Sequence, residues 1–392
     1  MAHMMQTYHP LPVVFERGEG AYLFDAGGRR YLDFAAGIAT SALGHGHPKL
    51  RQALFEQGAK LWHLSNFFTI PGQEQLAARL CSVSFAERAF FTNSGAEAVE
   101  CGIKTMRKYF SHTGQPERWR IITFVNAFHG RTLADCAASG QAKMLQGFGP
   151  PMPGFDHVPF GDIDAVAAAI GNETAGILIE PIQGEGGINA ASLDFLRQLR
   201  QLADRHGLLL FFDEIQCGLG RTGKLFAHEW AGVTPDVMAL AKGLGSGFPL
   251  GACLATERAA GGMTYGTHGS TGGGNPLAMA IGQAVLEVLL APGFLAEVER
   301  VAGLLRPGLE RLVQSQPEVF SAVRGTGLIL GLVCRPANLQ VVERLLANGL
   351  VTVPAGQNVI RLLPPLIIGD AEVALALDVL QQTGLEFRAV AA

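Results

Sequence analysis

The middle of the chain alternates short apolar runs with stretches of helical periodicity. Within each run, polar residues do not alternate with apolar ones, which is the pattern of a strand that is buried on both faces. The runs lie at 89–93, 121–126, 176–182, 208–215, 236–242 and 251–256, and helices are predicted from Gly95 and over 192–206. Strands of this kind separated by helices predict a mostly parallel sheet with helices on both faces.

The two ends of the chain have a different pattern. Alternation over 21–34, interrupted by two adjacent glycines, predicts a hairpin. Helical periodicity predicts further helices at 49–62, 73–83, 276–290, 294–315 and 370–384. We therefore expect an α/β protein with two domains, a large sheet domain over 50–275 and a smaller α+β domain formed by 1–49 together with 276–392.

The composition argues against several classes of function. The 392 residues are 48% apolar and 16% charged, which allows a large buried interior. A net charge of −4 without a long basic run gives no electrostatic basis for binding nucleic acid or a membrane surface. No apolar run reaches the about 20 residues of a membrane span. Six scattered cysteines indicate reduced thiols in a cytoplasmic protein, and the pair His45 and His47, with no carboxylate or thiolate nearby, predicts no metal site.

A glycine-rich stretch in the middle of the chain resembles a phosphate-binding loop. Gly218-x-x-x-x-Gly223-Lys224 matches most of the pattern found in nucleotide hydrolases, but that pattern continues with a serine or threonine whose hydroxyl holds Mg²⁺. Leu225 stands at that position, and 213–217 separates the apolar strand from the first glycine. A nucleotide site is therefore a distant alternative, and the glycines are expected to form a tight turn.

Polar residues cluster where the predicted strands end, which is where parallel sheets place their ligands. Asp213 and Lys242 both follow apolar runs, so both should lie at one edge of the sheet, where a salt bridge is the simple interpretation. The chemical interpretation is that a lysine amine forms Schiff bases with aldehydes, and that pyridoxal phosphate needs such a lysine and an acid beside its pyridine nitrogen. The other polar residues at strand ends are Asn93, Ser94, Asn126, Glu180 and Glu214.

Further residues are candidate ligands, and each also has an ordinary structural interpretation. Ser94-Gly95 in TNSGAEA opens a helix whose free N–H groups attract phosphate, although many helices begin this way. Phe128 is either a ring-stacking residue or a core residue, and Arg131 holds either a carboxylate or a surface acid. Glu185 lies in a glycine-rich loop, and Arg361 lies in an apolar strand, where an unpaired arginine is costly.

In their joint order, several segments resemble the class III, fold-type I pyridoxal-phosphate aminotransferases, and among these the acetylornithine group. The segments are LGHGHP, TNSGAEA, FHGRT, EPIQGEGG, FFDEIQCGLGRTG, LAKGLGSGFPLGA, THGSTGGGNPLA and IRLLPPL. The resemblance covers about residue 10 to residue 385. It implies a large, mostly parallel domain with a seven-stranded type of sheet, a smaller α+β domain, pyridoxal 5′-phosphate as cofactor, and a homodimer with shared active sites.

The resemblance also implies a role for each residue around the cofactor. Lys242 would hold the cofactor as a Schiff base and then move the proton, while Asp213 would pair with the pyridine nitrogen and Gln216 would reach the ring oxygen. Phe128 would stack on the ring, and Thr271 would reach the phosphate bound by the neighbouring subunit. The residues assigned to the cofactor are Gly95, Ala96, Phe128, Asp213, Glu214, Ile215, Gln216, Lys242 and Thr271.

The substrates that the resemblance implies are small amino acids. Ser270 and Arg131 would contact the acylated amino acid, with Arg131 on its α-carboxylate, and Glu185 would mask Arg361 until an α-carboxylate substrate binds. The implied reaction transfers the δ-amine of N2-acetyl-L-ornithine to 2-oxoglutarate, giving N-acetylglutamate 5-semialdehyde and L-glutamate in arginine biosynthesis. Succinylornithine, succinyldiaminopimelate, ornithine and 4-aminobutyrate are alternative amine donors, and a non-catalytic binding protein on the same fold is a distant alternative.

The sequence departs from the family pattern near the expected entrance of the site. Gly272 stands where relatives usually have phenylalanine, and Phe67-Phe68 stands where a pair containing tyrosine is common. Thr40-Ser41 differs from the usual Val-Asn type. The acyl group of the donor is therefore the feature that the resemblance specifies least.

Overall fold

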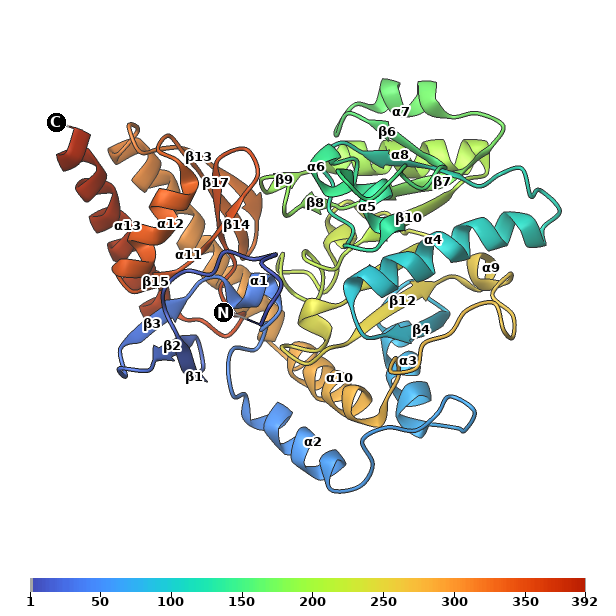
Figure 1. The fold of residues 1–392 in the computed structure, drawn as a ribbon, viewed down its shortest axis with the longest axis horizontal. Helices are drawn as coiled ribbons and strands as arrows, with labels where there is room; N and C mark the ends of the chain where they lie inside the picture. Colours follow the sequence, from blue (N-terminus) through green and yellow to red (C-terminus); the bar gives the residue numbers. More distant parts are fainter. Residues whose placement is uncertain (1–2, 392) are drawn as a thin grey trace.

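A seven-stranded sheet forms the centre of the molecule (Figure 1). The computed structural model describes residues 3–391, the last two without their side chains, so Met1, Ala2 and Ala392 of the predicted small domain lie outside the described residues. The strands, in spatial order, are β4 (Arg88–Thr92), β12 (Gly251–Ala255), β11 (Val237–Leu240), β10 (Leu209–Asp213), β7 (Thr174–Ile179), β5 (Arg120–Phe124) and β6 (Phe155–Val158). Only β12 runs antiparallel to its neighbours. The predicted mostly parallel sheet is confirmed.

Helices cover both faces of this sheet, which explains why its strands lack polar alternation. In β10, Phe211 packs into a buried cluster with residues of α4 (Gly95–His112), whereas its neighbours Leu210 and Phe212 pack into a second cluster with residues of α8 (Leu193–His206). All residues of β10 are buried. The shorter elements around the sheet are α5 (Leu133–Ser139), α6 (Ala142–Leu145), α7 (Ile163–Ala169), α9 (Glu257–Ala260), β8 (Ile182–Gln183), β9 (Asn189–Ala190), η1 (Ala227–Trp230) and η2 (Lys242–Leu244).

Two details of the sheet differ from the sequence prediction. The edge strand β6 was not predicted, because its sequence FDHV is short and has two polar residues at its centre. The run 236–242 was predicted as one strand, but β11 ends at Leu240 and Lys242 begins η2. Lys242 therefore lies just beyond the strand, in a turn.

The first strands of the chain pair with a strand from its C-terminal part. The predicted hairpin is present as β2 (Tyr22–Asp25) and β3 (Arg30–Asp33), with β1 (Phe15–Glu19) on its outer side. β3 is parallel to β15 (Leu350–Val351), so blue and red segments lie side by side in Figure 1. The neighbouring elements are β13 (Phe320–Thr326), β14 (Ile329–Cys334), β16 (Val353–Ala355), β17 (Val359–Leu362), α11 (Phe294–Ser315), α12 (Asn338–Ala347) and α13 (Asp370–Ala391).

Three helices form a separate layer below the sheet in Figure 1. α10 (Pro276–Leu289) packs against α2 (Pro48–Gly58) and α3 (Pro71–Ser82), so segments more than 190 residues apart lie together. Among the described residues, no single helix has the length and apolar character needed to cross a membrane. The pair α10 and α11 reaches that length and composition only with a bend of 68° between the two helices.

A left-handed turn lies between the hairpin and α2. Ala36, Gly37, Ile38 and Ala39 all have a positive φ, between 46° and 63°, and this conformation costs an L-residue with a Cβ roughly 1–2 kcal/mol. Asp33, which is 1% exposed, stabilises the start of the turn: its Oδ1 accepts the N–H groups of residues 35 and 36 at 2.9 and 2.8 Å. Its Oδ2 lies 2.8 Å from His45 Nε2.

We expect Asp33→Ala to lower the free energy of unfolding by about 3 kcal/mol, because two buried N–H groups lose a charged acceptor. The matched control is Asp25→Ala. Asp25 Oδ1 also accepts two backbone N–H groups, at 3.0 and 2.9 Å, but in the exposed turn of the hairpin, so about 1 kcal/mol is expected there. Urea unfolding followed by circular dichroism measures both, and equal losses would show that the left-handed turn needs no special support.

Candidate active site

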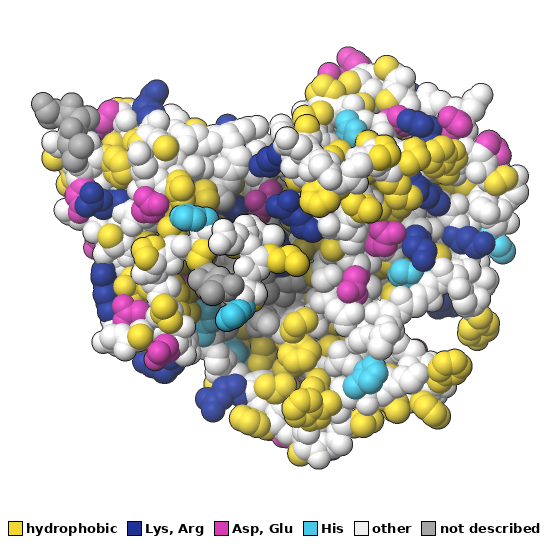
Figure 2. Space-filling model, viewed as in Figure 1, with side chains coloured by type: hydrophobic (Ala, Val, Ile, Leu, Met, Phe, Trp, Pro, Cys, Tyr) yellow, Lys and Arg dark blue, Asp and Glu magenta, His cyan; other side chains and the backbone are white. Residues whose placement is uncertain are grey.

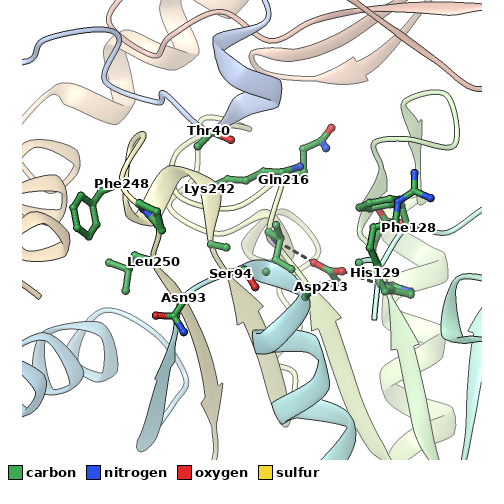
Figure 3. Close-up of a pocket in the computed structure, with 18 of the residues that line it drawn as sticks. Thr40, Asn93, Ser94, Phe128, His129, Asp213, Gln216, Lys242, Phe248 and Leu250 are labelled. Atoms are coloured by element: carbon green, nitrogen blue, oxygen red, sulfur yellow. Dashed lines mark hydrogen bonds and ion pairs between the residues drawn. The ribbon is translucent and has the colours of Figure 1, made fainter. Parts of the chain in front are cut away.

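A cavity of about 410 Å³ opens at the carboxyl edge of the large sheet. Its walls are formed by residues that follow β4, β5, β7, β10 and β11, as expected for a ligand site in a parallel sheet. In Figure 3, Thr40, Lys242 and Gln216 lie above Asp213 and Ser94. The predicted site residues that line the cavity are Gly95, Ala96, Phe128, Arg131, Asp213, Ile215, Gln216 and Lys242.

Lys242 contributes an amine with unusual acidity to this cavity. It begins η2 directly after β11, with a left-handed φ of 39°, and such backbone strain is concentrated at functional sites. Burial, with the positive charge of Arg361 as the second cause, lowers the pKa of Lys242 to about 8. A larger fraction of this amine is therefore neutral, and so nucleophilic, near pH 7 than for an exposed lysine.

Asp213 forms a buried pair with a histidine. Its Oδ2 lies 2.8 Å from His129 Nδ1, and its Oδ1 accepts the N–H of Ile215 at 3.1 Å. Asp213 is 4% exposed and His129 is 1% exposed. Burial alone would lower the pKa of His129, but the hydrogen bond and the negative charge of Asp213, with a contribution from Glu180, raise it. The raised pKa of His129 favours its positively charged form beside Asp213 at the cavity wall.

The start of α4 offers backbone N–H groups to the cavity. Ser94 caps the helix by accepting the N–H of Glu97 at 3.3 Å, and the N–H groups of Gly95 and Ala96 have no partner within the helix because they belong to its first turn. A Cβ on Gly95 would come within 2.8 Å of the Ile215 side chain. The absence of a side chain thus allows α4 to approach the turn after β10, and the free N–H groups with the helix dipole favour an anion.

The structure brings Glu185 and Arg361 together, although 176 residues separate them. Glu185 Oε1 lies 2.7 Å from Arg361 Nη1, and Arg361 Nη2 donates to the carbonyl of Pro354 at 2.9 Å. Arg361 is 2% exposed, and Glu185 is the one carboxylate within 4.0 Å of it in the part of the chain that the structure describes. Arg131, in contrast, has no acid within 4.0 Å among the described residues, and its guanidinium carbon lies 5.5 Å from the centre of the Phe128 ring.

Five predicted site residues do not line this cavity in their own chain: the paired Glu185 and Arg361, and also Glu214, Ser270 and Thr271. The Glu214 carboxylate is fully buried and accepts backbone N–H groups of η1, so it supports the protein interior. Ser270 accepts a hydrogen bond from the Asn93 amide at 3.1 Å and lines a neighbouring depression. Thr271 is exposed. A Cβ on Gly272 would lie 2.6 Å from Asn93 Oδ1, so a side chain there would require the Asn93 side chain to move.

Two titratable residues of the cavity were given no role by the sequence analysis. His129 lies between the candidate ligands Phe128 and Arg131 in FHGRT. Its position between two candidates was the one feature of the sequence that could have pointed to it. Glu180 was noted only as a polar residue at a strand end. In the structure it lines the cavity, is 6% exposed, and has a carboxyl whose pKa burial raises to about 7.

Comparisons with known proteins agree with this geometry. Acetylornithine aminotransferase of Mesorhizobium japonicum is 59% identical over 375 residues, which is 96% of this chain and 94% of that protein. The crystal structure of N-acetylornithine aminotransferase from Stenotrophomonas maltophilia is 41% identical, with a TM-score of 0.85 and 98% of each chain covered. Ornithine aminotransferase from Toxoplasma gondii is 32% identical, with a TM-score of 0.95 over 99% of this chain and 93% of that one.

These structural matches confirm the fold class expected from the sequence, a mixed α/β fold with a seven-stranded, mostly parallel sheet. The family model described as Aminotransferase class-III matches residues 3–383. The resemblance seen in the ordered sequence motifs is thereby confirmed, and the chain belongs to the class III aminotransferase family.

Proposed function

We propose that this chain is a pyridoxal-phosphate enzyme that transfers the δ-amine of N-acetylornithine to 2-oxoglutarate, as a step of arginine biosynthesis. The observation that carries the proposal is the arrangement of one cavity: an amine with a lowered pKa at Lys242, a buried carboxylate at Asp213, and an anion-binding helix start at Gly95. Relatives 57–59% identical to this chain bear the name acetylornithine aminotransferase, which supports this choice of amine donor.

The residues present fit the cofactor at each of its chemically distinct groups. The N–H groups of Gly95 and Ala96 would hold the phosphate, and Phe128 would stack on the ring. Gln216, whose Oε1 is buried without a hydrogen-bond partner among the described residues, would donate its side-chain N–H to the ring oxygen. Ile215 would pack against the other side of the ring site. When bound, pyridoxal phosphate supplies an electron sink that makes the hydrogen on the amine-bearing carbon of the substrate acidic.

Lys242 and Asp213 would perform the central chemistry of the chain itself. Neutral Lys242 would take the proton from the amine-bearing carbon of the substrate and later give a proton back, a role that suits a pKa of about 8. The Asp213 carboxyl, held 2.8 Å from His129 Nδ1, would pair with the pyridine nitrogen of the cofactor. Because both half-reactions use this one cavity, ping-pong kinetics are expected.

The two arginines would separate the two substrates. Arg131, which has no acid within 4.0 Å in the described range 3–391, would bind the α-carboxylate of the acylated donor. Arg361 stays covered by Glu185 at 2.7 Å while this donor reacts, and becomes available when Glu185 moves and 2-oxoglutarate presents its own α-carboxylate. An enzyme that accepts a terminal amine and an α-amino acid in one cavity needs such a cover, since an unpaired buried arginine is costly.

We also propose a cytoplasmic homodimer in which Thr271 and Ser270 complete the site of the neighbouring subunit. Thr271 is exposed in its own chain, and the loop that carries it contacts Asn66, beside Phe67, which is 97% exposed, and Phe68, which is 64% exposed. Figure 2 shows further hydrophobic side chains gathered over α2 on the same lower part of the molecule. An apolar surface of this kind is suited to contact with a second copy.

We also propose two domains, one that binds the cofactor and one that carries Arg361. Residues 50–275 would form the cofactor domain, and 1–49 with 276–392 would form the smaller domain that carries Arg361. The pairing of β3 with β15 supports the joining of the two chain ends.

The experiment that tests the function is a comparison of amine donors with 2-oxoglutarate as acceptor. We expect N-acetylornithine to have the highest kcat/KM, with ornithine and 4-aminobutyrate at least about tenfold lower, since ornithine lacks the acyl group and 4-aminobutyrate lacks the α-carboxylate that Arg131 would bind. Arg131→Lys serves as the internal control, because it keeps the charge but loses the bidentate geometry and should raise KM for N-acetylornithine only. A higher kcat/KM for succinylornithine or ornithine would replace the proposed donor.

A further inference from the structure

Glu180 connects two segments of the cavity wall through its two carboxyl oxygens. It follows β7 directly, and its Oε2 accepts the N–H of Phe128 at 3.0 Å while its Oε1 accepts the N–H of Gly184 at 3.3 Å. Phe128 belongs to the segment after β5, and Gly184 begins the loop that carries Glu185. One buried side chain thus touches the backbone of both segments.

This arrangement is strongest with an ionised carboxylate. A carboxylate accepts hydrogen bonds strongly at both oxygens, whereas an amide has one acceptor oxygen and a donor, and a protonated carboxyl has one strong acceptor oxygen and a hydroxyl that donates and accepts only weakly. With the two N–H groups pointing at opposite oxygens, any donor on Glu180 would face one of them. The bond to Gly184 is the longer of the two, at 3.3 Å compared with 3.0 Å to Phe128, so it is the contact that a single acceptor would give up.

The two connected segments carry different parts of the site. The Phe128 segment also bears Arg131, and the Gly184 loop places Glu185 on Arg361 at 2.7 Å. The Glu185 loop has a second anchor, because the Glu185 carbonyl accepts the N–H of Gly356 at 2.8 Å. Glu180 is therefore a buried, charged link between the proposed ring-stacking face and the cover on Arg361, next to a second, neutral link in which Gln183 Nε2 donates to the Val125 carbonyl at 3.0 Å.

We infer that Glu180 is a positioning residue: its carboxylate fixes the Glu185 loop relative to the Phe128 segment, and thereby stabilises the state in which Arg361 is covered. This inference rests on the proposed function for the roles of Glu185 and Arg361. The contacts themselves do not depend on that function.

The surroundings of Glu180 place its ionisation in the physiological range. Burial raises the pKa of its carboxyl to about 7. The positive charge of His129 lowers this pKa, and the negative charge of Asp213 raises it. The other titratable groups that interact with it are Cys217 and Lys242. Above about pH 7 the carboxylate can accept both N–H groups. Below about pH 7 the protonated carboxyl carries a hydrogen-bond donor, as the side-chain amide of Glu180→Gln would.

The first test measures the two amides directly in the protein without cofactor. We expect Glu180→Gln to increase hydrogen–deuterium exchange of the Gly184 amide about tenfold or more at pH 8, with a smaller change at Phe128, because a hydrogen bond to a charged acceptor is lost. The matched control is Glu173→Gln, the same substitution on an exposed residue just before the other end of β7. Unchanged exchange at Gly184 in Glu180→Gln would overturn the inference.

The second test separates the two half-reactions. Glu180→Gln should lower kcat/KM for N-acetylornithine about tenfold, because the covered state of Arg361 is weakened, while kcat/KM for 2-oxoglutarate changes less than threefold. A residue that only supports folding would lower both values equally, and that result would contradict the positioning role. If the wild-type protein does not use N-acetylornithine, the proposed function fails, whereas the exchange experiment still decides whether Glu180 holds the loop.

Discussion

Replacing Lys242 with alanine is expected to lower the rate of transamination by at least about 10⁴-fold, because the chain loses both its nucleophilic amine and its proton carrier. The variant should still fold, since the side chain of Lys242 faces a cavity. The measurements are kcat with N-acetylornithine and 2-oxoglutarate at saturating pyridoxal phosphate, and the intact mass of the protein after treatment with cofactor and borohydride. The wild-type protein should gain the mass of the reduced cofactor, and the variant should not.

Lys242→Arg is the matched second variant, because it keeps a positive charge beside Arg361 but its guanidinium cannot become neutral. It should be as inactive as Lys242→Ala. In the wild-type protein the rate of covalent cofactor uptake should increase with pH, with the midpoint of the increase near pH 8. The reason is that burial lowers the pKa of Lys242 to about 8 and the neutral amine is the reacting form. Activity within tenfold of wild type in either variant would show that another group performs this role.

The position of Lys242 and Asp213 could be predicted from the sequence for a simple physical reason. Parallel strands buried on both faces have an apolar pattern that can be read without the structure, and their carboxyl ends must meet at one edge. β10 and β11 are neighbours with Asp213 opposite Ala239, so residues that follow these two strands necessarily lie close together. The same reasoning explains why the start of α4, after β4, reaches the same cavity.

Other parts of the site depend on contacts that no local pattern encodes. The pair of Glu185 with Arg361 joins a loop after β8 to β17, and spacing along the chain carries no information about this distance. His129 and Glu180 act through hydrogen bonds to Asp213 and to backbone N–H groups, which become visible only when three loops meet. Sequence motifs identified these residues as neighbours of the site, but their roles required geometry.

The fold shows the same division between local and distant causes. The predicted helix at 294–315 agrees with α11 at both ends, because its apolar stripe is long and regular. The left-handed turn at 36–39 was not predicted, since three of its four residues have a Cβ and no local preference for positive φ. Its conformation is stabilised by Asp33 and His45 from outside the turn.

Replacing Asp213 with alanine is expected to lower kcat about 100- to 1000-fold, because a fixed charge beside the proposed pyridine nitrogen is lost. Asp213→Ala also leaves His129 without its buried partner at 2.8 Å, so stability is expected to fall as well. Asp213→Asn separates the two effects, since it keeps the size of the side chain and removes only its charge. Both variants should be measured for kcat with N-acetylornithine and for unfolding in urea.

The control for this prediction comes from the same glycine-rich segment. Lys224, the lysine of the sequence that resembles a phosphate-binding loop, lies outside the cavity, with its amine 5.1 Å from the centre of the Trp230 ring. Lys224→Ala should therefore lose only a cation–π contact of about 1 kcal/mol and keep kcat within about twofold. A loss of activity in Lys224→Ala equal to that in Asp213→Asn would place the chemistry at the glycine-rich turn. A loss in Asp213→Asn alone would locate the chemistry at the end of β10, where Asp213 lines the same cavity as Lys242.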